Sequence, residues 1–177
     1  MKLRALLAGA AMTALLLAGA QAAQRKDSAA VTAPAYPSIA EAARSQDWPA
    51  VRAMARQPGA ALNAVSTEGS TALHFAIHAG EAAVVQALLD AGTDVTTRNV
   101  AGISPLQLAV TTGDTAITRL LLARGADAKA LDEAKESLLM LAARHGDGEM
   151  ASALIAAGAE LNYVEPQLGQ DALMIAV

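Results

Sequence analysis

Gly69-Ser70-Thr71-Ala72-Leu73-His74-Phe75-Ala76-Ile77-His78-Ala79-Gly80 is the stretch that decides the fold, because its pattern returns at a fixed interval along the chain. Glycines recur at one constant spacing in two series. A leucine column and an alanine column keep the same spacing. The four columns are Gly80/Gly113/Gly146, Gly92/Gly125/Gly158, Leu73/Leu106/Leu139 and Ala76/Ala109/Ala142. Four columns in one register predict an array of internal repeats.

Each period predicts two short helices and a projecting loop. The segment 70–80 starts with Ser/Thr residues that can cap a helix and ends at a glycine that stops it. In the segment 81–91, Val84, Val85, Leu88 and Leu89 stand at helical spacing. Neither helix is long enough to be stable alone, so each must bury its apolar side against neighbouring units. The fold class expected is therefore all-α: a solenoid of stacked helix-turn-helix units with short projecting β-hairpin loops.

The unit resembles the ankyrin repeat, whose pattern is Gly-x-Thr-Pro-Leu-His-x-Ala, a glycine, Val-Val-x-Leu-Leu-Leu and Gly-Ala-Asp. Residues 69–76 carry the first motif with alanine in place of proline, and the next unit reads Gly102-Ile103-Ser104-Pro105-Leu106-Gln107-Leu108-Ala109. That unit closes with Leu120-Leu121-Leu122-Ala123-Arg124-Gly125-Ala126-Asp127. The third unit keeps the leucines and glycines but has Lys135 where the turn glycine belongs. We expect its hairpin tip to be distorted.

The resemblance divides residues 38–177 into three full units and two flanking pieces. The full units are 66–98, 99–131 and 132–164, preceded by a degenerate capping repeat, 38–65, and followed by a partial repeat, 165–177. In the capping repeat Val51 aligns with Val84, and Asp47 stands where Gly80 would be. Its polar side chains suit a terminal unit that faces water. The partial repeat has one extra loop residue and stops within its first helix, which favours a fragment of a longer array over a frayed end.

The segment 1–22 has the organisation of a cleaved export signal. Lys2 and Arg4 precede an uncharged run, and Ala20-Gln21-Ala22 places small residues where a signal peptidase reads them. We expect cleavage after Ala22, with an uncleaved membrane anchor as the alternative. Residues 23–37 are expected to form a flexible linker. The resulting location is the periplasm of a bacterium, or secretion from it, with no membrane attachment after cleavage.

Composition excludes several classes of function. The chain has 177 residues, 54% of them hydrophobic and 2% aromatic, so its core must be built from Ala, Leu, Val, Ile and Met. The absence of cysteine excludes disulfides, a thiolate nucleophile and Cys-ligated zinc. A net charge of −4, which becomes −6 once Lys2 and Arg4 are removed with the signal, argues against nucleic-acid binding.

The sequence predicts no catalytic residue, no metal site and no cofactor. No Gly-x-Ser-x-Gly motif or phosphate-binding glycine loop is present, and Ser70, Ser104 and Ser137 fit turn or capping roles. His74 and His78 stand four residues apart, but no third metal ligand lies near them in sequence. In ankyrin repeats the histidine equivalent to His74 bonds backbone between neighbouring loops. The protein is therefore not expected to be an enzyme.

The resemblance implies that a partner protein binds at the loop tips and at the exposed ends of the first helices, on the concave face. Carried over to this chain, the candidate residues are Thr67, Glu68, Ser70, His78, Val100, Ala101, Ile103, Thr111, Thr112, Glu133, Glu136, Arg144 and His145. Val100, Ala101 and Ile103 form an apolar tip, with the alternative that they tuck against the adjacent hairpin, and Arg144 is the expected charged anchor. The protein is expected to be a monomeric, non-enzymatic scaffold. The alternative is a periplasmic small-ligand or metal-binding chaperone that uses His78 and His145.

Overall fold

The computed structural model describes residues 36–176, and residues 36–177 form one compact unit. The predicted signal segment and most of the predicted linker lie outside the described residues. The helices are α2 (Ile39–Arg44), α3 (Trp48–Ala55), α4 (Ala72–His78), α5 (Ala82–Asp90), α6 (Pro105–Thr111), α7 (Thr115–Ala123), α8 (Leu138–His145), α9 (Gly148–Ala156) and α10 (Ala172–Ile175). Tyr36, which we expected in the linker, packs against the core, and its hydroxyl donates to Asp47 Oδ2 at 3.2 Å.

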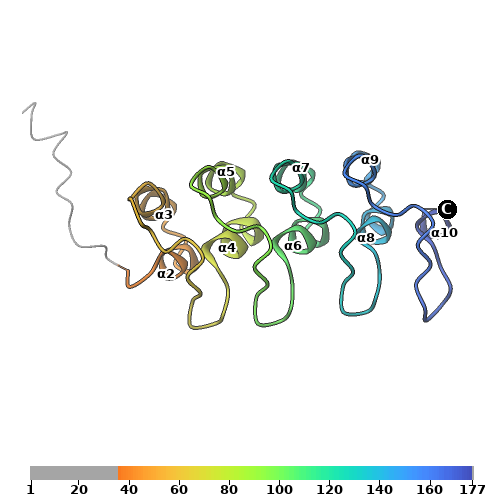
Figure 1. The fold of residues 1–177 in the computed structure, drawn as a ribbon, viewed down its shortest axis with the longest axis horizontal. Coiled ribbons are helices and arrows are strands. Elements are labelled where there is room, and N and C mark those ends of the chain that lie inside the picture. The colour runs from red at the N-terminus through yellow and green to blue at the C-terminus, as the bar shows by residue number, and fades with distance from the viewer. Residues whose placement is uncertain (1–35, 177) are drawn as a thin grey trace, which may run out of the picture. The chain divides into compact units, whose positions relative to one another are not determined.

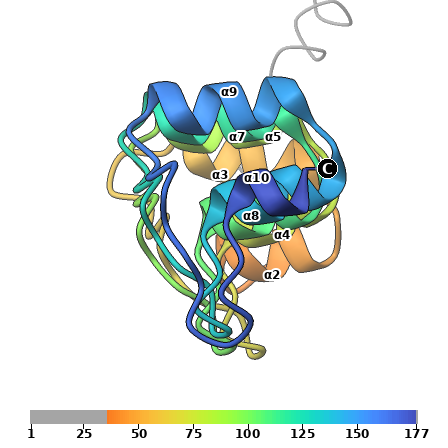
Figure 2. The same cartoon turned by 90° about the vertical axis from the view of Figure 1, so that its right-hand side faces the viewer.

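The helices of the compact unit stack in pairs along one direction (Figure 1). The second helix of each pair (α3, α5, α7, α9) lies in one layer and the first helix (α2, α4, α6, α8) in another, with α10 continuing the first-helix layer (Figure 2). The hairpin loops project from the same side of every pair. The all-α repeat solenoid expected from the constant period is thus confirmed.

The core is a ladder of aliphatic side chains that repeats with the units. In the three full units the second helix buries an i, i+4 pair completely: Val84 and Leu88, Ile117 and Leu121, Met150 and Leu154. Residues four apart lie on one side of a helix, so each pair faces its own first helix and the neighbouring units. These helices have seven to nine residues in the full units, too few to persist alone in water. Stacking is therefore what makes them fold.

Side-chain caps fix where most helices begin. Ser104 and Ser137 accept backbone N–H bonds at the starts of α6 and α8, and Asp114 and Asp147 do the same for α7 and α9. Such a cap contributes about 1 kcal/mol, because it satisfies an N–H group that has no partner within the helix. The capping role expected for Ser104 and Ser137 is confirmed. Thr71 starts α4 without a side-chain cap bond to the backbone, since its hydroxyl pairs with His74 instead.

The alignment of the first repeat needs a one-residue correction. We expected Asp47 at the turn that Gly80 makes, but Gln46 takes that left-handed conformation (φ 57°). Asp47 is the N-cap of α3 and accepts the Ala50 N–H at 3.1 Å. Val51 N–H donates to Asp47 O as Val85 N–H donates to Glu81 O, so Val51 corresponds to Val85 and not to Val84. The first helix, α2, is one residue shorter than α4, and this accounts for the shift.

The hairpins are tight turns closed by single antiparallel bridges, Val65 with Thr71 and Leu131 with Ser137. The expected distortion at Lys135 is wrong. Lys135 adopts the left-handed conformation (φ 66°) of Gly69 and Gly102, and its N–H donates to Asp132 O at 3.1 Å, as Gly102 N–H donates to Asn99 O at 2.9 Å. The turn keeps its shape, but the backbone at Lys135 is strained, because the left-handed conformation costs a residue with a side chain about 1–2 kcal/mol.

Replacing Lys135 with glycine should therefore stabilise the protein. The left-handed penalty disappears, while the greater freedom of glycine in the unfolded chain offsets part of the gain, so we expect about 0.5–1 kcal/mol more free energy of unfolding. Urea denaturation followed by circular dichroism measures it. Lys135→Ala is the control, since alanine removes the same side chain and keeps the strain; an equal gain from both variants would contradict the explanation.

A second local defect lies in the middle of the stack. Thr118 on α7 is fully buried, and within the described part of the chain its hydroxyl has no hydrogen-bond partner. Val85 occupies the equivalent position in the preceding unit and is equally buried. Thr118→Val should raise the free energy of unfolding by about 1 kcal/mol, because it removes the desolvation cost of the hydroxyl at constant shape. Thr118→Ser, which keeps the hydroxyl and loses a methyl group, should lower it, and thermal melting distinguishes the two.

Among residues 36–176 no helix is both long enough and apolar enough to cross a bilayer.

Candidate functional site

The residues predicted to bind a partner lie at the hairpin tips and at the ends of α4, α6 and α8. Three are half-buried: Ser70, Ile103 and Glu136. The others are exposed: Thr67, Glu68, His78, Val100, Ala101, Thr111, Thr112, Glu133, Arg144 and His145. Because all hairpins project from one side of the stack, the units present their tips as a row (Figures 1 and 2).

The tips stack on one another, which decides how Val100 lies. A Cβ placed on Gly69 would meet Val100 Cγ1 at 2.1 Å, so Val100 lies directly over the preceding glycine. Glu133, one unit further, has the same relation to Gly102, with 3.3 Å between a Cβ there and Glu133 Oε1. Val100 nevertheless remains 80% exposed. Both expectations for this tip hold in part: Val100 touches the adjacent hairpin and still offers an apolar surface.

A column of polar residues organises the turns, and sequence reasoning missed it. Ser66, Asn99, Asp132 and Glu165 recur with the period of the repeat, and each side chain accepts backbone N–H bonds from its own turn. Asn99 Oδ1, for example, accepts from Ala101 N–H and Ile103 N–H at 3.0 Å each. The spacing was visible in the sequence. The four different residue types concealed the shared role, because only their acceptor oxygens are common.

Glu165 is the extreme member of this column. Glu165 is 3% exposed. Its carboxylate accepts hydrogen bonds from the backbone N–H groups of Gln167 at 2.6 Å, of Leu168, and of Gln170 at 3.5 Å. Burial by itself raises the pKa of this carboxyl, but the backbone N–H bonds outweigh it and leave the pKa below its usual range. The turn contains the extra residue noted in the sequence, and the longer glutamate side chain spans the wider loop.

Arg144, the expected charged anchor, is already paired. Its guanidinium donates to Glu136 Oε1, which raises the pKa of Arg144. The structure thus brings together two predicted site residues, Arg144 and Glu136, as partners of each other. Arg44 in the first repeat is similarly paired with Glu41 at 2.8 Å and lies 3.6 Å from Glu68. A protein partner would have to compete with these exposed ion pairs, which solvent screening keeps weak.

His74 joins two repeats, as the resemblance implied. It is 2% exposed; Nδ1 lies 2.8 Å from Thr71 Oγ1 and Nε2 lies 3.1 Å from Ile103 O. A carbonyl can only accept, so Nε2–H donates to Ile103 and Nδ1 of the neutral ring accepts from the Thr71 hydroxyl. Burial lowers the pKa of His74, although the bond to Ile103 opposes the shift. Its role is to fix the hairpin that carries Val100.

The surface histidines do not form a metal site within the described residues. His78 and His145 are exposed on different units. Residues 36–176 contain no group of three or more His, Asp or Glu side chains that could hold a metal ion. The metal-binding chaperone considered from the sequence gains no support from this geometry.

An apolar stripe adjoins the predicted contact residues. Phe75, Leu108 and Leu141 recur with the same period on α4, α6 and α8 and are only partly buried. Each lies three residues before a predicted contact residue, respectively His78, Thr111 and Arg144, so the two columns share one side of the first helices. The sequence analysis did not identify this stripe.

The stacked helix pairs share a ladder of buried i, i+4 aliphatic pairs and a row of projecting turns, and together these define a helical repeat protein. The family model for ankyrin repeats in three copies matches residues 39–132 and 106–177. The chain belongs to the ankyrin-repeat family. A comparison with curated proteins gave no match. Ankyrin repeats generally act as protein–protein interaction modules, and the family is typically non-enzymatic.

Proposed function

We propose that the protein is an exported, non-enzymatic scaffold that binds a partner protein through its hairpin tips and the adjoining side of its first helices. The observation that carries the proposal is the exposed tip of the central unit, where Val100 is 80% exposed. Nothing in the repeat requires an apolar side chain there, since Glu133 occupies the same position one unit later with the same stacking relation. Val100 and Ala101 are both exposed on this turn, and adjacent exposed apolar residues on a projecting turn mark a candidate contact surface.

The chemistry of the surface indicates what the partner presents. The central unit offers Val100 and Ala101 at its tip and Thr111 and Thr112 at the end of α6, all uncharged. The flanking units carry charges, with Glu68 on one side and Glu133 on the other. We infer that the partner places an apolar patch against the central unit. The rigid stack requires little rearrangement to accept it. The signal segment would deliver the protein to a bacterial periplasm or beyond.

A pull-down from periplasmic extract, comparing the tagged chain with its Val100→Asp and Thr111→Arg variants, tests this proposal. Val100→Asp is compatible with the fold because Glu133 shows that an acidic side chain fits at this position. We expect the captured partner to bind each variant at least about 10-fold more weakly, as for a central contact residue.

The matched control is Ala116→Asp, which introduces the same charge at an exposed position on α7 in the other helix layer. Circular dichroism establishes that each variant is folded. A partner that is retained by Val100→Asp and Thr111→Arg as well as by Ala116→Asp would place the binding surface elsewhere and overturn the proposal.

A further inference from the structure

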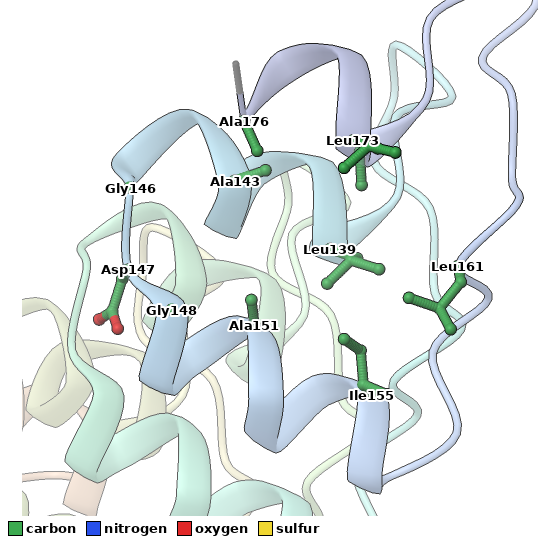
Figure 3. A pocket seen from close by; sticks show the side chains of 11 residues that line it. Leu139, Ala143, Gly146, Asp147, Gly148, Ala151, Ile155, Leu161, Leu173 and Ala176 are labelled. Carbon is green, nitrogen blue, oxygen red and sulfur yellow. The ribbon is translucent and has the colours of Figure 1, made fainter.

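The layer of second helices contains a hollow between α3 and α5 that is bordered by two arginines. It measures about 390 Å³, and its lining residues are Arg52, Ala55, Arg56, Ala87, Asp90 and Ala91. We call it the arginine hollow. Figure 3 shows a hollow of a different kind, at α8, α9 and α10, whose lining includes Leu139 and Leu173 and no basic residue. Two guanidinium groups beside one hollow are notable in a chain whose net charge is −4, and they suit an anionic ligand.

The charges around the arginine hollow do not cancel within the described part of the chain. The ion pairs among residues 36–176 include neither Arg52 nor Arg56. Asp90, on the opposite wall, is already engaged: its carboxylate accepts from Arg124 and from Gln86 Nε2, the latter at 2.8 Å. The bond from Arg124 is the main cause that lowers the pKa of Asp90. The two arginines of α3 therefore remain available to an external anion.

The repeat itself shows which chemistry suits Arg52. In the register that aligns Val51 with Val85, Arg52 corresponds to Arg119 on α7. Arg119 pairs across the unit boundary with Glu149 of α9 at 3.0 Å. The position of Glu149 is occupied on α5 by alanine, Ala83. Arg52 thus stands where the stack elsewhere forms an arginine–carboxylate pair, but the neighbouring helix supplies no carboxylate.

The same comparison holds for Arg56. Its counterpart on α5 is Asp90, which pairs across the next unit boundary with Arg124. The position of Arg124 is occupied at the end of α5 by Ala91. Both ion pairs that bridge neighbouring second helices elsewhere in the stack are therefore reduced to a lone arginine at the α3–α5 boundary.

Small side chains open the space beside these arginines. Between α5 and α7 the equivalent positions are filled by Leu89 and Leu120, which pack against the core. At the arginine hollow they are Ala55 and Ala87. A volume of about 390 Å³ lies within the range of sites that hold ligands. The hollow therefore combines room for a ligand with two cationic groups to hold it.

We propose that the arginine hollow binds an acidic peptide segment of a protein, whose carboxylates pair with Arg52 and Arg56. Each guanidinium presents parallel N–H donors that match a carboxylate. A peptide suits the site better than one small anion. The two partner positions that alanine occupies, Ala83 and Ala91, are eight residues apart on α5, about 12 Å along the helix axis. Acidic side chains on one peptide can reach both ends of such a site, whereas a single small ion reaches one.

This site is independent of the surface proposed above for the partner protein. The arginine hollow lies in the layer of second helices, whereas Val100 lies on a hairpin that projects from the stack (Figure 2). Val100→Asp should therefore leave the binding of an acidic peptide unchanged. Failure of one proposal does not imply failure of the other.

Fluorescence anisotropy of a rhodamine-labelled hexaglutamate peptide, titrated with the purified chain at low ionic strength, tests the site. Hexaglutamine with the same label is the uncharged comparison. We expect saturable binding with a Kd below about 1 mM, at least about 10-fold tighter than for hexaglutamine and weaker at higher salt.

Replacing both arginines, Arg52→Gln with Arg56→Gln, should weaken hexaglutamate binding at least about 10-fold, because it removes both charge-assisted contacts. Gln86 shows that glutamine fits the position of Arg52 in the repeat. The matched control is Arg98→Gln with Lys129→Gln, which removes the same charge from exposed positions outside the hollow. It should change the Kd by less than about 2-fold.

A second pair of variants keeps both arginines and supplies their partners from within the chain. Ala83→Glu with Ala91→Glu, both at exposed positions, should pair with Arg52 and Arg56 and weaken hexaglutamate binding at least about 10-fold. Ala116→Glu with Ala123→Glu adds the same charge on α7, also at exposed positions, and should weaken it much less. Circular dichroism establishes that each variant is folded.

Three results would overturn the proposal. The first is equal binding of hexaglutamate and hexaglutamine by the wild type, and the second is equal hexaglutamate binding by the wild type and by the chain without Arg52 and Arg56. The third is displacement of hexaglutamate by an equimolar amount of inorganic phosphate, since the site would then be one for a small anion.

Discussion

Leu121→Ala is expected to lower the free energy of unfolding by about 3 kcal/mol, within the range for a buried leucine that leaves a cavity. Leu121 is fully buried on α7 and belongs to the i, i+4 ladder that joins the second helices to the first. The cost is large because the core has few large side chains that could fill the cavity, since 2% of the residues are aromatic. The free energy of unfolding of a whole domain is about 5–15 kcal/mol, so this single substitution removes a considerable fraction of it.

Urea denaturation followed by circular dichroism at 222 nm measures the loss. In a repeat protein each unit is stabilised mainly by its neighbours, so a defect in the central unit weakens the contacts on both sides and should shift the whole transition. Val100→Ala is the control, because it removes methyl groups from a side chain that is 80% exposed and should change stability by less than about 0.5 kcal/mol. Equal effects of the two variants would show that the ladder is not the main source of stability.

The sequence determined the helices because their signals are local and repeated. Glycines at a constant spacing, a leucine column and Ser104 or Ser137 ahead of each apolar run indicate where helices start and stop. These features act within a few residues of the chain, so the pattern contains nearly all the information. His74 was also predictable, because its bond to Ile103 is a property of the repeat and not of this particular surface.

The turns were harder to predict because the energies involved are small. Lys135 was expected to distort its hairpin, but about 1–2 kcal/mol of left-handed strain is less than the turn gains from its own hydrogen bonds. Asp132 N–H donates to Glu136 O at 3.0 Å, and the Tyr163 hydroxyl, from the next hairpin, donates to Lys135 O at 2.6 Å. Gln46, at the end of α2, also adopts the left-handed conformation in spite of its side chain. A sequence pattern shows the strained residue but not the bonds that compensate for it.

The positions of the proposed contact residues on the fold followed from the sequence, but the pairing of their side chains did not. The predicted contact residues lie on the tips and helix ends as expected, but the Arg144–Glu136 ion pair joins residues eight apart across a helix start, which no helical spacing rule describes.

His74→Ala is expected to cost about 2–3 kcal/mol, because it leaves the Thr71 hydroxyl and the Ile103 carbonyl without their partner and opens a cavity at a site where the histidine is 2% exposed. Chemical denaturation measures the loss. Pro105 starts α6 directly after the Ile103–Ser104 segment, so loosening that hairpin should also disturb the central tip. His78→Ala is the control, since His78 is exposed on the same helix and should be nearly neutral.

Acidification should also destabilise the wild type, in the direction that the lowered pKa of His74 sets. Burial lowers the folded-state pKa of His74 below its ordinary value of 6.5, so the unfolded chain takes up the proton first as the pH falls. The stability that the neutral ring contributes is complete above about pH 6.5 and declines below it, by at most about 1.4 kcal/mol per pH unit for one proton. Glu41 and Asp147, whose pKa values are lowered by hydrogen bonds, lose their contribution only as the pH falls below the ordinary carboxyl values of 4.5 and 3.8. The change in stability between pH 6.5 and pH 4.5 therefore reports mainly on the protonation of His74.

His74→Gln isolates the titration from the packing. Glutamine occupies the equivalent position in the next unit, where Gln107 is buried, so the substitution fits the repeat. It carries no titratable proton, and the variant should be less stable than the wild type at pH 7.5 yet lose less on going to pH 5. Urea midpoints at several pH values measure the difference. A variant whose stability falls as steeply as that of the wild type between pH 6.5 and pH 5 would show that His74 is not the group responsible, because the sign and the window of the effect follow from its buried, neutral ring alone.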